Sequence, residues 1–267
     1  MVSDSRAGQP GVPNDGVANG HAMQHFDTRH DHLVSRREHS RVTDTSAIPE
    51  PTLWTPPPAV HTRGTLAVIA GAAESTRVYE RFGRRIAIDG YVVGVFEAAD
   101  SDAARAWLAD QDASPRVLVG SDVGAAAVLT ALAEREQLDG AIVAATPVGV
   151  AGPVEVESRT ACPVHLGVLA GEDAQTRRSV DITLPARDFL SAVAVPVLAV
   201  HGGADTVAPF AEAAAYLGAI PSLDVVETIG GLHDSLNDVS HRSVAARVVL
   251  WLEALRTGAP VVRTVAP

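Results

Sequence analysis

Short apolar runs alternate with amphipathic stretches along most of the chain after residue 63. Runs rich in β-branched and small apolar residues predict strands over 65–69, 91–96, 141–145, 197–201 and 223–228, with a further one starting at 116. Apolar residues at helical spacing predict helices over 76–88, 102–111, 124–137, 209–217 and 243–255. Strands separated by helices are typical of a parallel sheet that is covered on both faces. The pattern therefore predicts an α/β fold with a mostly parallel central sheet.

The first 50 residues lack this pattern. They are rich in Gly, Asp, Ser, Arg and His and contain few large apolar side chains, a composition that cannot bury a core of its own. We therefore expect a disordered or loosely attached extension over residues 1–50 and one folded domain over 51–267. Trp54 precedes three prolines and is expected to pin this stiff lead-in to the domain. Residues 148–195 are irregular and predict a short lid.

The stretch from residue 116 to 127 combines an apolar strand, a tight turn and a helix start made of small residues. Gly120 and Gly124 lie two residues before and two after Asp122. A strand-to-helix elbow needs glycine at these places, because a side chain at either one would collide with the turn. Ser121 has valines at the same distances. The spacing therefore predicts Asp122 at the tip of the elbow, with Ser121 in a supporting position.

Two later strand ends carry further candidates for a functional site. Asp205 follows the strand at 197–201, and His233 follows the strand at 223–228. Because the carboxyl ends of parallel strands meet at one edge of a sheet, we expect both residues to lie near Asp122. An alternative interpretation of Asp205 is a helix cap.

Neighbouring polar residues receive a structural interpretation. His201 lies at a strand end just before a glycine turn and is expected to be structural. Asp234 and Asp238 are expected to be solvated or to cap a helix. The polar candidates of the lid are His165, Glu172, Asp173, Arg177 and Arg178.

The three motifs, in the chain order nucleophile, acid, histidine, resemble the α/β-hydrolase superfamily over roughly residues 51–257. The stretch Ala-Gly-Ala-Ala-Glu-Ser at 70–75 is similar to the oxyanion loop His-Gly-x-Pro-Glu-Ser of epoxide hydrolases and haloalkane dehalogenases, the branch with an aspartate nucleophile. The resemblance implies a triad of Asp122, His233 and Asp205.

The same resemblance assigns roles to the loop at 70–75. It implies that the main-chain N–H groups of Ala72 and Val123 face the reacting oxygen. Gly71 is implied to support this loop. Glu74 is expected either to order the loop or to cap the following helix, and the sequence leaves both open.

An aspartate at the elbow differs chemically from a serine. A carboxylate is ionised at neutral pH and can attack a saturated carbon that bears a leaving group, which gives an ester that His233 can hydrolyse through water. Two alternatives stay open: an esterase, lactonase or lyase with His233 as the main base, and a binding or scaffold protein that has lost turnover. Between residues 147 and 195 the sequence has no Tyr or Trp, the residues that assist leaving groups in the resembled families.

Composition narrows the classes of partner. The net charge is −11, from 21 basic and 32 acidic residues, which argues against nucleic acid and anionic membranes and leaves a small-molecule substrate. Every basic residue other than histidine is arginine, which excludes lysine Schiff bases and P-loops. No cofactor or metal is expected. The single cysteine, Cys162, and an N-terminus without an apolar core lead us to expect a cytoplasmic protein, whose oligomeric state the sequence leaves open.

Overall fold

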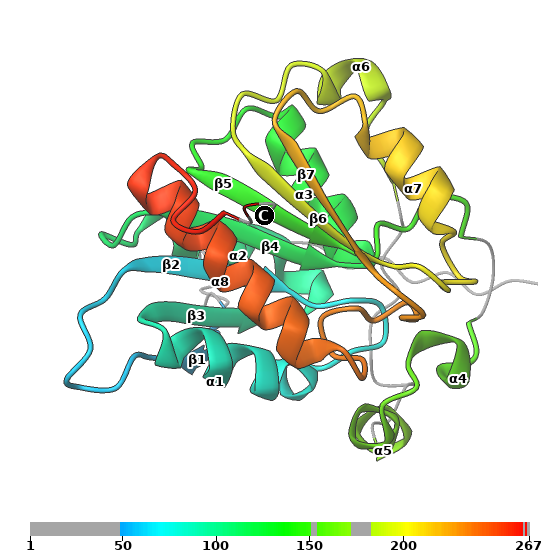
Figure 1. Ribbon diagram of the computed structural model, residues 1–267. Coiled ribbons are helices and arrows are strands. Elements are labelled where there is room, and N and C mark those ends of the chain that lie inside the picture. The colour runs from blue at the N-terminus through cyan, green and yellow to red at the C-terminus, as the bar shows by residue number, and fades with distance from the viewer. Residues whose placement is uncertain (1–48, 151–153, 172–182, 264, 266–267) are drawn as a thin grey trace, which may run out of the picture. The chain divides into compact units, whose positions relative to one another are not determined.

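The computed structural model describes residues 49–150, 154–171, 183–263 and 265. The predicted extension over 1–50 lies outside these residues, except for positions 49 and 50. The described residues belong to one compact unit, and a seven-stranded sheet runs through them (Figure 1). The order of the strands in the sheet is β1-β3-β2-β4-β5-β6-β7. The strands are β1 (Thr52–Trp54), β2 (Gly64–Ile69), β3 (Tyr91–Phe96), β4 (Arg116–Ser121), β5 (Gly140–Ala144), β6 (Val197–Gly202) and β7 (Leu223–Thr228).

Helices follow most of the strands, as the sequence predicts. The α-helices are α1 (Glu80–Ile88), α2 (Ser101–Ala109), α3 (Val123–Ala133), α4 (Val156–Arg159), α5 (Pro163–Gly171), α6 (Arg187–Leu190), α7 (Phe210–Leu217) and α8 (His241–Thr257). Two 3₁₀ turns, η1 (Thr76–Tyr79) and η2 (Ala98–Asp100), precede α1 and α2. All pairs from β2 to β7 are parallel, and β1 alone pairs antiparallel, with β3. The mostly parallel sheet is therefore confirmed.

Helices cover both faces of the sheet, and alternate residues of each strand feed two separate cores. In β4, Val117 and Val119 pack into the core beneath α1 and α8. Leu118, between them, packs into the core beneath α2, α3, α6 and α7. Strands buried on both faces read as continuous apolar runs, which is why the sequence identified them without any alternation of polar and apolar residues.

The edge strand β1 was not predicted from the sequence. It is only three residues long and half exposed, so its sequence carries little strand signal. Its Trp54 packs against α1, where a Cβ atom on Gly83 would lie 2.5 Å from the indole ring. The expectation that Trp54 pins the lead-in to the domain is thus confirmed, and the pinning extends the sheet by one strand.

Two predicted helices differ from the observed ones. The helix predicted over 76–88 begins as the 3₁₀ turn η1 and becomes α-helical only at Glu80. The helix predicted over 124–137 ends at Ala133, because Arg135 adopts a left-handed conformation with φ of 61° that an α-helix cannot contain.

The segment between β5 and β6 contains the three short helices α4, α5 and α6. Helices α4 and α5 lie beyond the carboxyl ends of the central strands (Figure 1), and a lid over 148–195 stays a prediction. Among the described residues, none of the helices is both long enough and apolar enough to span a bilayer.

The glycines at the start of α3 generate the first prediction. A Cβ atom on Gly124 would lie 2.2 Å from the carbonyl oxygen of Ile69, and main-chain atoms cannot yield as a side chain can. We expect Gly124→Ala to lower the free energy of unfolding by about 3 kcal/mol or more, measured by urea denaturation. Gly167→Ala in α5 is the matched control, because no atom lies within 4 Å of its added Cβ. It should be neutral or stabilise by about 0.5–1 kcal/mol. Equal effects of both changes would contradict the argument.

Candidate active site

The tip of the turn between β4 and α3 is Asp122. Its backbone has φ 53° and ψ −120°, a strained conformation for a residue with a side chain. The N–H of Asp122 donates a hydrogen bond to the carbonyl of Ala144 in β5 at 3.0 Å, which anchors the turn to the sheet. Ser121 is the last residue of β4 and is 1% exposed. The structure thus presents Asp122 at the elbow and keeps Ser121 in the core.

The two carboxylate oxygens of Asp122 have different surroundings. Oδ2 accepts a hydrogen bond of 3.0 Å from the main-chain N–H of Ala72. Oδ1 lies 3.6 Å from Nε2 of His233, close enough for an ion pair but too far for a hydrogen bond. Nε2 is buried and has no hydrogen-bond partner among the described residues. One oxygen is therefore held in place, and the other faces a histidine nitrogen that is free to bind something else.

Asp205 orients His233 from the opposite side of the ring. Its Oδ2 lies 2.8 Å from Nδ1 of His233, and its Oδ1 accepts hydrogen bonds from the N–H groups of Val207 and Ala208. Asp205 therefore contacts the histidine and holds its own loop. It does not cap α7, whose N-cap position is Pro209 without a side-chain cap, so the helix-cap interpretation is wrong. His201 lies 3.1 Å from the same Oδ2 and donates to the carbonyl of Ala208, which fits its expected structural role.

These contacts set the charge state of the histidine. Burial opposes protonation of the imidazole, but the carboxylates of Asp122 and Asp205 outweigh it and raise the pKa of His233 to about 10. Burial also opposes ionisation of Asp205, yet the hydrogen bonds from His201 and His233 hold the pKa of this carboxyl well below its usual range. At neutral pH the site therefore holds an imidazolium between two carboxylates.

The loop at 70–75 carries the second element of the site. Oε2 of Glu74 accepts hydrogen bonds from the N–H of Gly71, at 2.8 Å, and from the hydroxyl of Tyr79, at 2.5 Å. Glu74 therefore orders the loop, the first of the two roles that the sequence leaves open. Val123 begins α3, so its N–H is one of the amides without an intrahelical acceptor.

The structure corrects the interpretation of the two aspartates after His233. Asp234 is 1% exposed and binds the guanidinium of Arg159, and Asp238 is fully buried and accepts the N–H groups of Leu232 and Ala161. The expectation of solvated side chains is wrong, because both carboxylates are buried among polar partners, and neither of them caps α8, whose N-cap residue is Ser240. Arg159 carries no sequence signal of a site role, since its partners lie 75 or more residues away.

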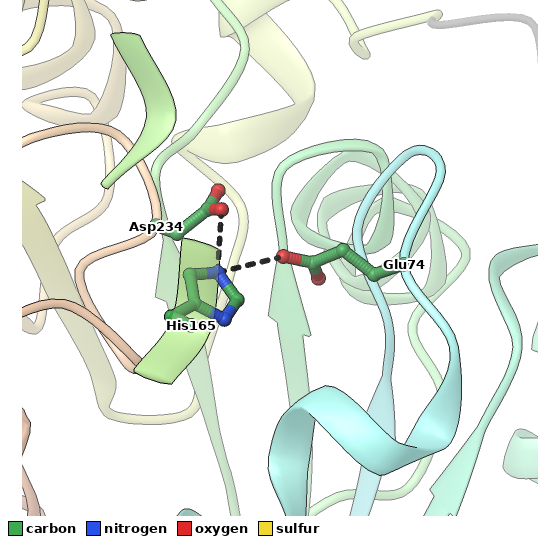
Figure 2. A group of neighbouring side chains, drawn as sticks. All are labelled: Glu74, His165 and Asp234. Carbon is green, nitrogen blue, oxygen red and sulfur yellow. Dashed lines mark hydrogen bonds and ion pairs between the residues drawn. The ribbon is translucent and has the colours of Figure 1, made fainter. Parts of the chain in front are cut away.

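Glu74, Asp234 and the lid residue His165 point toward one another (Figure 2). Nε2 of His165 lies 2.8 Å from Asp234 and 3.9 Å from Glu74, and one ligand atom from each residue falls within 4.8 Å of the others. Such groups can bind a divalent metal. Here Nη2 of Arg159 contacts Oε1 of Glu74 at 3.0 Å and Oδ1 of Asp234 at 2.9 Å, so a guanidinium already supplies the positive charge. The cluster is an ion-pair network. The other predicted polar residues of the lid, Glu172, Asp173, Arg177 and Arg178, lie outside the described residues.

Comparison with known proteins identifies the class of fold. No protein-family model and no curated sequence matches the chain. Among solved structures, a monoacylglycerol lipase from Paleococcus ferrophilus gives a TM-score of 0.62 at 13% identity, over 76% of this chain and 97% of that one. A soluble variant of a monoglyceride lipase from Saccharomyces cerevisiae gives a TM-score of 0.64 at 12% identity, over 76% of this chain and 90% of that one. A bromoperoxidase from Bacillus anthracis gives a TM-score of 0.52 at 17% identity, over 72% of this chain and 93% of that one.

These neighbours establish that the chain has the α/β-hydrolase fold, in agreement with the fold that the motif order implies. At such low identities the likeness concerns the fold alone. Lipases and esterases among the neighbours do not single out the aspartate-nucleophile branch, so the chemistry must be argued from the side chains of this site.

The charge coupling between Asp122 and His233 gives a second prediction. In Asp122→Asn one of the two carboxylates beside His233 is replaced by a neutral amide, and the pKa of His233 should fall from about 10 toward the usual value near 6.5. An NMR titration of the imidazole measures this pKa without any substrate. The control is Asp224→Asn, which removes an exposed carboxylate of β7 and should leave the titration unchanged. An equal pKa in wild type and Asp122→Asn would show that Asp122 does not hold the proton on His233.

Proposed function

We propose that this chain is a hydrolase in which Asp122 attacks a saturated carbon atom of a small molecule and displaces a leaving group. The observation that carries the proposal is the asymmetry of the Asp122 carboxylate. Oδ2 is held by the N–H of Ala72, whereas Oδ1 lacks a close hydrogen bond and lies beside the unpartnered Nε2 of His233. A nucleophile needs one oxygen fixed and the other unengaged.

The first step forms an ester on Asp122. An electron pair of Oδ1 makes the new carbon–oxygen bond while the bond to the leaving group breaks, and the leaving group departs with that electron pair. A carboxylate performs this attack without a base, because it is already ionised at neutral pH. The negative charge moves from Asp122 to the departing group.

The second step hydrolyses the ester. Esterified Asp122 is neutral, so the pKa of His233 falls, the imidazole releases its proton, and Nε2 becomes able to take one from water. The resulting hydroxide attacks the carboxyl carbon of Asp122. The negative charge then develops on Oδ2, where the N–H of Ala72 already donates and where that of Val123 is proposed to donate as well. Collapse breaks the bond between the carboxyl carbon and the ester oxygen, and this oxygen takes the proton from His233 and leaves as an alcohol. The hydroxyl proton left on the Asp122 carboxyl then passes to Nε2 of His233, where it replaces the proton that the imidazole gave to solvent after ester formation, and the carboxylate is restored.

The charge state of the site weighs against the alternative in which His233 is the main base from the start. With Asp122 ionised, the pKa of His233 is about 10, so the imidazole is protonated at neutral pH. Only a reaction that first neutralises Asp122 makes it a base. The sequence between 147 and 195 also lacks a tyrosine that could protonate an oxygen leaving group, which favours a leaving group that departs as a stable anion.

Isotope labelling tests the proposal directly. Turnover in water enriched in heavy oxygen should place the label in the Asp122 carboxylate, because hydrolysis breaks the bond between the carboxyl carbon and the ester oxygen. Mass spectrometry of the peptide that contains Asp122 measures the label. Probes are a panel of short alkyl halides, epoxides, esters and lactones. Turnover without label would support the histidine-base alternative, and no turnover on any probe would support the binding protein.

A pair of variants provides the trapping experiment. His233→Gln should still form the ester but hydrolyse it about 10²- to 10⁴-fold more slowly, so that an alkyl adduct accumulates on Asp122. Asp122→Asn should give no adduct. The adduct is measured as the mass shift of the intact protein after incubation with the probe that wild type turns over. An adduct in both variants would exclude Asp122 as its site.

A further inference from the structure

Arg159 is buried although it belongs to the lid. It is the last residue of α4 and is 7% exposed. Burial alone opposes its charge, but the carboxylates of Asp234 and Glu74 raise the pKa of its guanidinium above the usual value. A buried guanidinium with all its partners in place forms rigid, directional contacts, because its five N–H donors lie in one plane.

One end of this guanidinium fixes the loop that carries the Ala72 donor. Nη1 donates to the carbonyl oxygen of Ala72 at 2.5 Å, and Nη2 donates to Oε1 of Glu74 at 3.0 Å. The other oxygen of Glu74 accepts the N–H of Gly71. The peptide that presents the N–H of Ala72 to Asp122 is therefore held on its N-terminal side through Glu74 and on its C-terminal side by Arg159 directly.

The other end of the guanidinium fixes the loop that carries His233. Nε donates to both oxygens of Asp234, at 3.1 and 3.0 Å, and Nη2 donates to Oδ1 at 2.9 Å. The N–H of Asp234 donates back to the carbonyl of Arg159 at 2.8 Å. His165, from the next lid helix α5, binds the remaining side of Asp234 (Figure 2). Asp234 is the residue directly after His233 in the chain.

We propose that Arg159 is a positioning residue, through which the lid sets the placement of the Ala72 N–H and of His233 relative to Asp122. Its guanidinium bridges the loop at 70–75 and the loop that follows β7. Among the described ion pairs of Glu74 and Asp234, the only other basic partner is His165. The effect on turnover rests on the proposed function, whereas the effect on loop geometry does not.

Hydrogen exchange at the Ala72 amide tests the geometry without substrate. In Arg159→Met the loop loses its direct hydrogen bond and the anchor of Glu74, and the Ala72 amide should exchange at least about tenfold faster, measured by NMR. Arg81→Met is the matched control. Arg81 also joins residues 148–195 to the His233 loop, through Cys162 and the carbonyl of Asn237, and neither of these partners lies in the loop at 70–75. Unchanged exchange in Arg159→Met, or equal acceleration in both variants, would overturn the proposal.

Two further variants separate positioning from loss of folding. Arg159→Met combined with Asp234→Asn removes the cation together with one of its two buried anions, which leaves fewer unpaired charges than Arg159→Met alone, and should still show fast exchange at Ala72. Arg159→Lys retains the charge but cannot form the three-way contact, so it should not restore slow exchange. Full restoration by lysine would show that only the charge matters and would overturn the positioning role.

Where a substrate is found, kcat of Arg159→Met should fall by about 100-fold, as for loss of an oxyanion donor, with a smaller change in KM. If no variant and no wild-type protein turns over any probe, the proposed function fails, but the exchange data still decide the role of Arg159. Slow Ala72 exchange that is lost in Arg159→Met would then support a positioning role in a site of different chemistry.

Zinc binding provides an independent test of the cluster. Removal of the guanidinium leaves Glu74, His165 and Asp234 with ligand atoms within 4.8 Å of one another. Calorimetric titration with zinc chloride should therefore detect at least about tenfold tighter binding to Arg159→Met than to wild type. Detectable zinc binding that is equal or tighter in wild type would mean that the cluster accepts a metal beside Arg159, and the arginine would then not be its organising cation.

Discussion

The close approach of α3 to strands β2 and β4 is the constraint on which the candidate site depends. Gly120 and Gly124 allow it, because added Cβ atoms would lie 2.1 and 2.2 Å from carbonyl oxygens of the main chain. The contact forces the chain to turn sharply at Asp122, which takes the positive φ. That turn aims the carboxylate at the N–H of Ala72 on the adjacent strand end. Strain in one residue thus places a charged group where two loops and a helix N-terminus converge.

The buried charged residues of the site form two groups, each with one cation between two carboxylates. In the first, the imidazolium of His233 lies between Asp122 and Asp205. In the second, the guanidinium of Arg159 lies between Glu74 and Asp234. The first group contains an unsatisfied nitrogen and a carboxylate oxygen without a close partner, whereas every polar atom of the Arg159 side chain is engaged. An unpaired polar atom in an interior of low polarity costs free energy. We therefore interpret the His233 group, which contains unpaired atoms, as the reactive one, and the fully paired Arg159 group as its support.

The fold does not determine the reaction, and the side chains of the candidate site restrict the reactions that are chemically possible. Neighbours with this fold include lipases and esterases, yet the elbow here carries an aspartate, and the adjacent serine is buried in β4. A carboxylate attack on an ester would give an anhydride, which lies uphill, whereas attack on a saturated carbon gives an ester that water can cleave. The high pKa of His233 fits the order of events that we propose, in which the histidine becomes a base only after Asp122 has lost its charge.

The sequence by itself determined the strands, the covered parallel sheet, the elbow and the chain order of Asp122, Asp205 and His233, because apolar periodicity and glycine spacing are local signals. The sequence did not predict the edge strand β1, because three partly exposed residues are too few to show a periodic pattern. Only the tertiary structure decided that Glu74 orders the loop at 70–75, that Asp234 is buried, and that Arg159 joins them. The contacts of Arg159 span 75 to 87 residues of sequence, and the sequence does not indicate whether a charged side chain is solvated or paired in the interior.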